Sequence, residues 1–150
     1  MKAFLSGQGA MPRITVEAFN QLVEAELPFA RELGMSIEAI EAGRAVGRLS
    51  YRESHLRPGG TLAGPALMAL ADFTMYAATL SVVGQVALAV TTNFSINFLK
   101  RPAPADVIAE ARVLKGGKRL VVSEVSLRSD GSDDLIAHVT GTYSIPPETR

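Results

Sequence analysis

Asp72 is the residue best placed for chemistry, because it is the only charged residue in a long apolar segment from Pro65 to Val83. A carboxylate in such surroundings is costly to bury unless it is hydrogen-bonded, paired or protonated. It is therefore a candidate general base or nucleophile. The alternative is a structural carboxylate at a subunit interface, which caps backbone amides or pairs with an arginine.

A glycine-rich turn, GGTLAGP over residues 59–65, leads directly into the same segment. Pro65 suits the first turn of a helix, where its missing N–H is not needed. The amides of Gly64 and Ala66 then lie at the positive end of the helix dipole, where an anion or oxyanion can bind. An ordinary helix entry, with glycines for a tight turn, explains the same residues. His55 lies just before this turn and is a further candidate for binding a substrate.

Basic residues gather between positions 100 and 119. This stretch contains six basic and two acidic residues, so its net charge is +4. The basic residues are Lys100, Arg101, Arg112, Lys115, Lys118 and Arg119, and the acidic ones are Asp106 and Glu110. This excess predicts a phosphate-bearing ligand held at strand ends and a turn. The four residues expected to hold it are Lys100, Arg101, Lys118 and Arg119. The alternative is a soluble hairpin with solvated side chains.

The composition limits the classes of protein to consider. Of 150 residues, 47% are hydrophobic and 20% charged, which is typical of one globular domain over residues 1–150, with residues 1–13 flexible. With no cysteine and two histidines, the chain has little from which to build a metal site. The charges of the 15 basic and 15 acidic residues cancel, so the net charge does not indicate binding to nucleic acid. The N-terminal residues contain no apolar run long enough for a secretion signal, so we expect a cytoplasmic protein.

The segment Pro65–Val83 predicts a buried helix that ends at Gly84. Asp72 near its middle argues against a membrane span, because a charge at bilayer depth is costly. The helix is apolar around most of its circumference and must be surrounded. One sheet from the same subunit leaves part of it uncovered, which predicts a homo-oligomer.

The remaining patterns predict an α+β fold, with a curved antiparallel sheet around this central helix. Apolar spacing predicts an opening helix over Thr15–Leu33, which Pro28 divides and Gly34 ends. Strands are expected near 35–41, 44–51, 106–115, 119–128 and 135–145. A further strand is expected over 86–98, in which Phe94 and Ile96 share one face and Thr91 lies on the other. Short joins make neighbouring strands antiparallel.

The stretch GTLAGPALMALAD, residues 60–72, resembles the signature of hot-dog-fold acyl-CoA thioesterases of the phenylacetic-acid-degradation type. The stretches NFSINFLKRPAPAD, LKGGKRLVVSEVSL and AHVTGTYSI resemble the third strand, basic hairpin and closing strand of that family. The similarity covers roughly residues 35–146. It implies a hot-dog fold and hydrolysis of acyl-coenzyme A. It also implies no cofactor beyond the coenzyme A of the substrate, and a dimer or a dimer of dimers.

The resemblance also assigns roles by position. Asp72 stands at the catalytic carboxylate, as nucleophile or general base. Gly64 stands at the glycine whose N–H polarises the thioester carbonyl. Thr91 lies at, or one place from, a Ser/Thr that orients the attacking water from the neighbouring subunit, with Thr92 beside it. The family regions that contact the nucleotide and phosphates match residues 100–101 and 118–119.

The motif departs from the family at three positions. Ala63 replaces the histidine, Pro65 replaces the second glycine and Arg57 replaces the asparagine, whereas Gly60 and Gly64 are retained. Arg57 either pairs with Asp72 or binds an acidic acyl group. A non-catalytic acyl-CoA or acyl-ligand binding protein of the same fold is the second hypothesis. A hydratase fits worse, because no histidine lies near Asp72.

Overall fold

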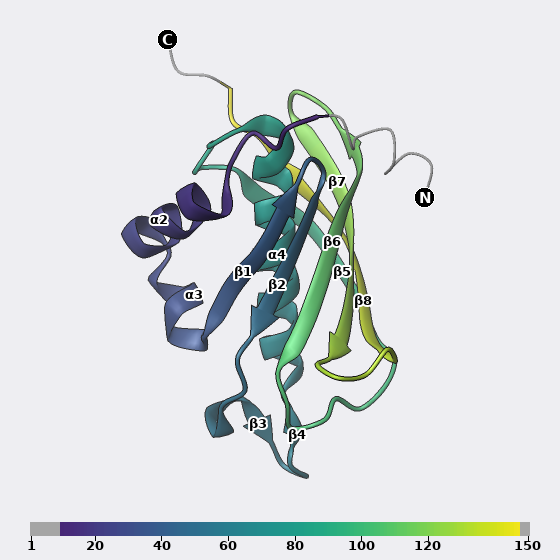
Figure 1. The fold of residues 1–150 in the computed structure, drawn as a ribbon. Helices are drawn as coiled ribbons and strands as arrows, with labels where there is room; N and C mark the ends of the chain where they lie inside the picture. Colours follow the sequence, from purple (N-terminus) through teal and green to yellow (C-terminus); the bar gives the residue numbers. More distant parts are fainter. Residues whose placement is uncertain (1–9, 148–150) are drawn as a thin grey trace.

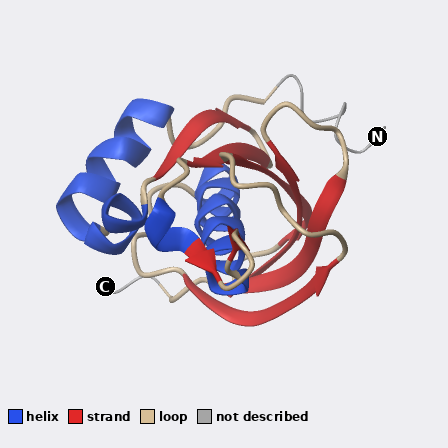
Figure 2. Cartoon of the chain, turned by 90° about the horizontal axis from the view of Figure 1, so that it is seen from below, coloured by secondary structure: helices blue, strands red, loops and turns tan. Residues whose placement is uncertain are grey.

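The centre of the molecule is one long helix, α4 (Gly64–Val83), around which a curved sheet is wrapped (Figures 1 and 2). The computed structural model describes residues 10–147. Pro65 lies in the first turn, and the N–H of Gly84, at φ +91°, donates to the Leu80 carbonyl at the other end. The prediction of a buried helix over Pro65–Val83 is confirmed. The helix is long and apolar enough to cross a membrane, but 72% of its apolar window is buried inside the fold.

The sheet has six antiparallel strands in the order β1-β2-β6-β7-β8-β5. Their bounds are β1 Met35–Glu41, β2 Arg44–Leu49, β5 Val90–Phe98, β6 Val107–Gly116, β7 Leu120–Ser129 and β8 Leu135–Ser144. Alternate residues of β7 and β8, such as Val121, Val125 and Val139, are fully buried against α4. Strands β1 and β5 form the two edges. The expected α+β architecture is therefore confirmed, and it is the hot-dog fold.

Two short helices, α2 (Val16–Glu26) and α3 (Pro28–Leu33), precede the sheet. The Thr15 side chain caps α2 by accepting from the Ala18 N–H at 3.1 Å. The predicted division at Pro28 and the end at Gly34, at φ +80°, are both confirmed. The expected flexibility of residues 1–13 falls mostly outside the described residues, although the Arg13 N–H donates to the Ser81 carbonyl at 2.8 Å.

The loop between β2 and α4 contains structure that the sequence did not predict. A 3-10 turn, η1 (Glu53–His55), is followed by a two-stranded hairpin of β3 (Leu56–Arg57) and β4 (Thr61–Leu62). Strand β2 ends at Leu49 rather than at 51. The reason is that the Tyr51 N–H donates to the Asp106 carboxylate at 2.7 Å and not to a neighbouring strand.

Strand β5 begins at Val90, because residues 86–89 form a turn in which the Ala89 N–H donates to the Val86 carbonyl. Its register against β8 shifts between Thr91 and Asn93, which marks a β-bulge. The extra residue turns Thr91 toward α4, on the same side as Phe94 and Ile96. The prediction that Thr91 lies on the opposite face was therefore wrong.

Candidate active site

Asp72 lies half-buried in the middle of α4, and two hydroxyl groups hold its carboxylate. Thr91 Oγ1 donates to Asp72 Oδ1 at 2.5 Å. Tyr143 Oη lies 2.9 Å from the same oxygen and 3.1 Å from the Asp72 carbonyl. Within residues 10–147 no group donates to Oδ2. The carboxylate is thus fixed through one oxygen, and the other remains available to react.

Tyr143 is a site residue that the sequence reasoning missed. It pairs with Thr91 across the β5–β8 ladder, and its side chain is 3% exposed. Burial, and next the negative charge of Asp72, raise the pKa of Tyr143 far above its ordinary value. The phenol therefore stays protonated at neutral pH and acts as a donor. The alternation of apolar and polar residues along β8 indicates that Tyr143 points inward. Its contact with Asp72, however, depends on the register in which β8 pairs with β5.

A cavity of about 260 Å³ opens beside Asp72. Apart from Asp72, Thr91 and Tyr143 its lining is almost entirely apolar or aromatic: Leu27, Phe29, Met35, Ala69, Phe73, Tyr76, Ala89 and Val90. The Tyr76 hydroxyl is already used, because it donates to the Ala87 carbonyl at 2.9 Å. This cavity, which we call the apolar cavity, suits an uncharged ligand group.

Gly64 lies at the start of α4 beside a different cavity of about 530 Å³. The residues that line it include Arg57, Phe98, Lys100 and Arg101, and we call it the basic cavity. The Gly64 N–H has no acceptor within the described part of the chain, so it is free to bind a ligand oxygen. Lys100 pairs with Asp134, whereas Arg57 and Arg101 have no ion-pair partner among the described residues.

The two halves of the expected site are separated within one chain. Gly64 and Asp72 are eight residues apart on one helix, which corresponds to about 12 Å along its axis. One thioester carbonyl cannot contact both groups across that distance. Arg57 likewise lines the basic cavity and not the apolar one, so the expected pair with Asp72 does not form within the chain.

The four basic residues also do not meet in one chain. Lys118 and Arg119 line a third cavity with Arg13, at the end of β7 that pairs with Ser144. Lys100 and Arg101 follow Phe98, which pairs with Ala137 at the opposite end of β8. The antiparallel sheet therefore separates residues that the sequence reasoning had grouped into one phosphate site.

The remaining candidates lie away from the Asp72 carboxylate. His55 is 4% exposed, and its Nε2 lies 2.9 Å from the Leu33 carbonyl, while Nδ1 has no hydrogen-bond partner among residues 10–147. Gly60 adopts φ +74° in the exposed hairpin turn. Thr92 is exposed, and its hydroxyl lies 3.3 Å from the Thr142 carbonyl. Among the described residues no cluster of three or more His, Asp or Glu side chains could hold a metal ion.

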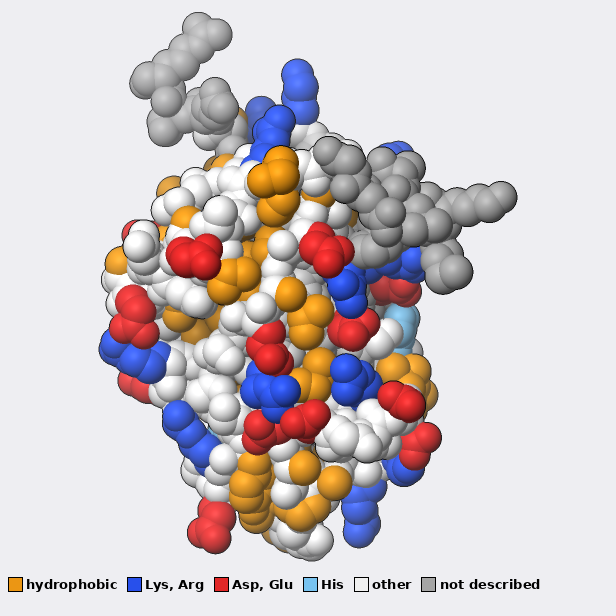
Figure 3. Space-filling view, in the orientation of Figure 1, with side chains coloured by type: hydrophobic (Ala, Val, Ile, Leu, Met, Phe, Trp, Pro, Cys, Tyr) orange, Lys and Arg blue, Asp and Glu red, His pale blue; other side chains and the backbone are white. Residues whose placement is uncertain are grey.

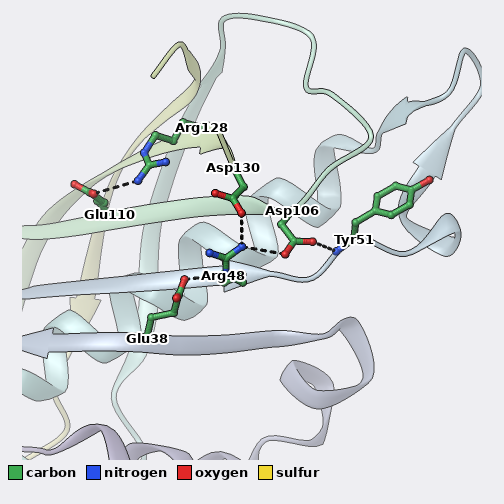
Figure 4. A network of polar contacts seen from close by, with 7 residues as sticks. All are labelled: Glu38, Arg48, Tyr51, Asp106, Glu110, Arg128 and Asp130. Atoms are coloured by element: carbon green, nitrogen blue, oxygen red, sulfur yellow. Dashed lines mark hydrogen bonds and ion pairs between the residues drawn. The ribbon is translucent and has the colours of Figure 1, made fainter. Parts of the chain in front are cut away.

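A network around Arg48 ties together the loops that flank the basic cavity (Figure 4). Arg48 pairs with Asp130 at 2.8 Å, Glu38 at 2.9 Å and Asp106 at 3.0 Å. Asp106 also accepts the Tyr51 N–H, which joins the loop before the β3–β4 hairpin to the segment carrying Lys100 and Arg101. Acidic and basic side chains alternate over this face of the sheet (Figure 3).

We expect Arg48→Gln to lower the thermal unfolding midpoint at pH 7 by about 3 °C, because three carboxylates then lose their shared counter-charge. Arg48 lowers the pKa of Asp130 in the folded state, so this stabilisation is present above the ordinary carboxyl pKa and is lost as the pH falls through the lowered one. The difference between the two proteins should therefore disappear in strong acid. Scanning calorimetry at several pH values measures it; a difference independent of pH would contradict the ion-pair explanation.

Comparison with known proteins shows the family to which this chain belongs. Residues 59–136 match the thioesterase superfamily, a range that contains Gly64, Asp72 and Thr91. A relative named "Putative esterase" from Saccharolobus solfataricus is 31% identical over 148 residues, which is 97% of this chain and 95% of the relative. A solved structure described as a "putative thioesterase" from Silicibacter sp. TM1040 shares 40% identity, with a TM-score of 0.83 over 93% of this chain and 97% of that chain.

A mutant of the phenylacetic acid degradation protein PaaI from Thermus thermophilus is also similar in structure. It is 30% identical, with a TM-score of 0.70, and the match covers 79% of this chain and 99% of that one. The curved sheet around a helix that carries a held carboxylate, with a free amide at its start, is the hot-dog fold with a candidate site for thioester hydrolysis. The chain belongs to the thioesterase superfamily, whose activity is hydrolysis of thioesters.

Proposed function

We propose that this protein hydrolyses acyl-coenzyme A thioesters at a site shared between two subunits of a homo-oligomer, dimer or dimer of dimers. One observation carries the proposal. The held carboxylate of Asp72 and the free amide of Gly64 are both present, but about 12 Å of helix separates them. A second subunit is needed to bring one group of each kind to the same thioester.

Strand β5 offers the surface for this pairing. It is an edge strand, and apolar side chains near both its ends are exposed, namely Val90 at 58% and Phe98 at 52%. Antiparallel pairing of β5 with its copy about a two-fold axis sets the Phe98 end of one subunit beside the Thr91 end of the other. Gly64 lies next to Phe98, and Asp72 accepts a hydrogen bond from Thr91. The same pairing brings the regions of Arg101 and Arg119 from the two subunits toward each other.

The chemistry follows from these positions. The thioester carbonyl oxygen accepts the Gly64 N–H of one subunit, which stabilises the negative charge that develops there. Asp72 of the other subunit removes a proton from a water molecule through Oδ2, and the resulting hydroxide attacks the carbonyl carbon. The carbon–sulfur bond then breaks, and the proton taken up by Asp72 passes to the leaving thiolate, which gives a carboxylic acid, the thiol of coenzyme A and the ionised carboxylate again. Direct attack by Asp72, followed by hydrolysis of the anhydride, uses the same geometry.

The two cavities suggest how the substrate is oriented. The basic cavity, with Arg57 and Arg101, suits the coenzyme A side of the thioester, and the apolar cavity suits the acyl side. The likeness to a phenylacetic acid degradation protein supports a related acyl substrate. Coenzyme A thioesters are intracellular metabolites, which agrees with a cytoplasmic protein.

A non-catalytic acyl-CoA binding protein is the second candidate, favoured by the loss of the motif histidine at Ala63 and by Arg57. Release of free thiol from a panel of acyl-CoAs, compared with calorimetric binding of the same compounds, decides between the two. The proposal expects thiol release on at least part of the panel. Binding without release on every compound would establish the second candidate instead.

We expect Arg101→Glu to raise KM for acyl-CoA by about three- to tenfold, because a charge-assisted contact to phosphate is lost at an exposed position. Binding should also become less sensitive to salt. A short thioester without the nucleotide should be barely affected. Lys115→Glu serves as the matched control, because this exposed residue of the same basic segment lines none of the cavities described above. Equal losses on both substrates would contradict the phosphate contact and indicate damage to the fold.

A further inference from the structure

The break between α2 and α3 directs side chains into the wall of the apolar cavity. Leu27 ends α2 in a non-helical conformation, at φ −129° and ψ 61°, and Pro28 begins α3. Leu27 and Phe29, on either side of this proline, both line the cavity beside Asp72. In one continuous helix, the side chains at positions 27 and 29 would point in other directions than they do across the break. The proline therefore has a consequence at the site and not only in the N-terminal segment.

Phe29 on the helix side of this cavity is 59% exposed, much like Val90 on strand β5 at 58%. The lining also contains three buried aromatic rings: Phe73 and Tyr76 on α4, and Tyr143 on β8 stacked on Tyr76 with ring centres 5.8 Å apart. Those rings are fixed by packing, whereas Phe29 is free of the core. A change at Phe29 therefore alters the cavity at little cost to the fold.

The lining also defines the chemistry of the occupant. The hydroxyls of Tyr76 and Tyr143 already donate to protein oxygens, and the one charged group in the lining is the Asp72 carboxylate. An acidic group would be repelled there, and a polar group would find no free donor from those two tyrosines. The volume of about 260 Å³ corresponds to about eight groups of the size of a water molecule.

We propose that the apolar cavity binds the acyl group, and that Leu27 and Phe29 at the Pro28 break set the length of chain it accepts. The substrates are uncharged apolar acyl groups of up to about eight non-hydrogen atoms. Acidic acyl groups are excluded, since the one charged group in this lining is the Asp72 carboxylate. This inference rests on the proposed function, and it adds the substrate class and the residues that select it.

The test uses straight-chain acyl-CoAs from acetyl to palmitoyl, with kcat/KM measured by thiol release. In the wild-type protein, kcat/KM should rise by about fourfold per methylene until the cavity is filled, near eight carbons, and should not rise further. Phe29→Ala should move this limit to longer chains, and Phe29→Trp should move it to shorter ones. Leu114→Ala is the control, because Leu114 is 50% exposed and lines none of the cavities described above. Its chain-length profile should match that of the wild type.

Binding of S-alkyl-CoA thioethers of the same lengths, measured by calorimetry, separates this inference from the proposed function. If thiol is released but neither Phe29 variant changes the chain-length limit, the acyl cavity is assigned wrongly and hydrolysis stands. If no thiol is released but thioether affinity follows the Phe29 variants, hydrolysis is wrong and the cavity assignment stands. If neither activity nor affinity depends on chain length, the inference is overturned.

Discussion

Asp72→Asn should lower kcat for acyl-CoA hydrolysis by about two to four decades, the range that loss of a general base usually costs. Asparagine keeps the shape of the side chain and an oxygen that can accept from Thr91 and Tyr143. KM should therefore stay close to the wild-type value. Thermal stability should hold or rise, because a half-buried charge is replaced by a neutral amide.

The matched control for this variant is Asp133→Asn, which removes a carboxylate from an exposed turn. It should leave kcat unchanged. Unchanged activity in Asp72→Asn would refute the catalytic role of this carboxylate. Loss of folding or of assembly would instead make Asp72 a structural residue of the interface. Asp72→Ala is less informative, since it adds a cavity to the loss of the base.

Gly64→Pro should lower kcat by about 10²- to 10³-fold, the usual cost of removing one oxyanion donor. Proline deletes the N–H and is tolerated at the first position of a helix. The preceding residue, Ala63, is already extended at φ −69° and ψ 140°, as a residue before proline must be. The substitution thus removes a single donor at a position whose preceding residue already has the conformation that proline requires.

Gly64→Ala is the control that separates the amide from packing. A Cβ at this position lies 3.1 Å from the Phe98 ring, so both variants press on the same flexible side chain. Only the proline variant also loses the donor. Near-wild-type kcat in Gly64→Ala, together with loss in Gly64→Pro, supports the amide. Equal loss in both variants would show that crowding against Phe98, and not the missing N–H, is responsible.

The elements of the fold that follow from local patterning could be predicted from the sequence. The all-apolar run predicted α4, and Pro28 and Gly34 predicted the break and the end of the opening helix. Asp72 could be selected because a lone charge in such a run is costly. These inferences depend on residues close together in the chain, where composition and spacing determine the outcome.

The parts of the site that depend on strand register could not be predicted in this way. A one-residue bulge in β5 reverses the face of Thr91, and alternation alone cannot reveal it. Tyr143 reaches Asp72 because β8 pairs with β5 in one register out of several. Arg101 and Arg119 lie at opposite ends of the sheet because of the directions of their strands. A count of charges along the sequence contains no information on strand direction.

The most direct test of the shared site is to mix the two inactive variants. Asp72→Asn and Gly64→Pro chains are unfolded together in equal amounts, refolded, and assayed beside each variant refolded alone. In a mixed dimer one site holds both defects, and the other holds the intact Gly64 of one chain and the intact Asp72 of the other. Random pairing about a two-fold axis should therefore restore about a quarter of the activity of refolded wild type. Activity no higher than the mean of the two separate variants would show that each chain works alone, and would contradict the shared site.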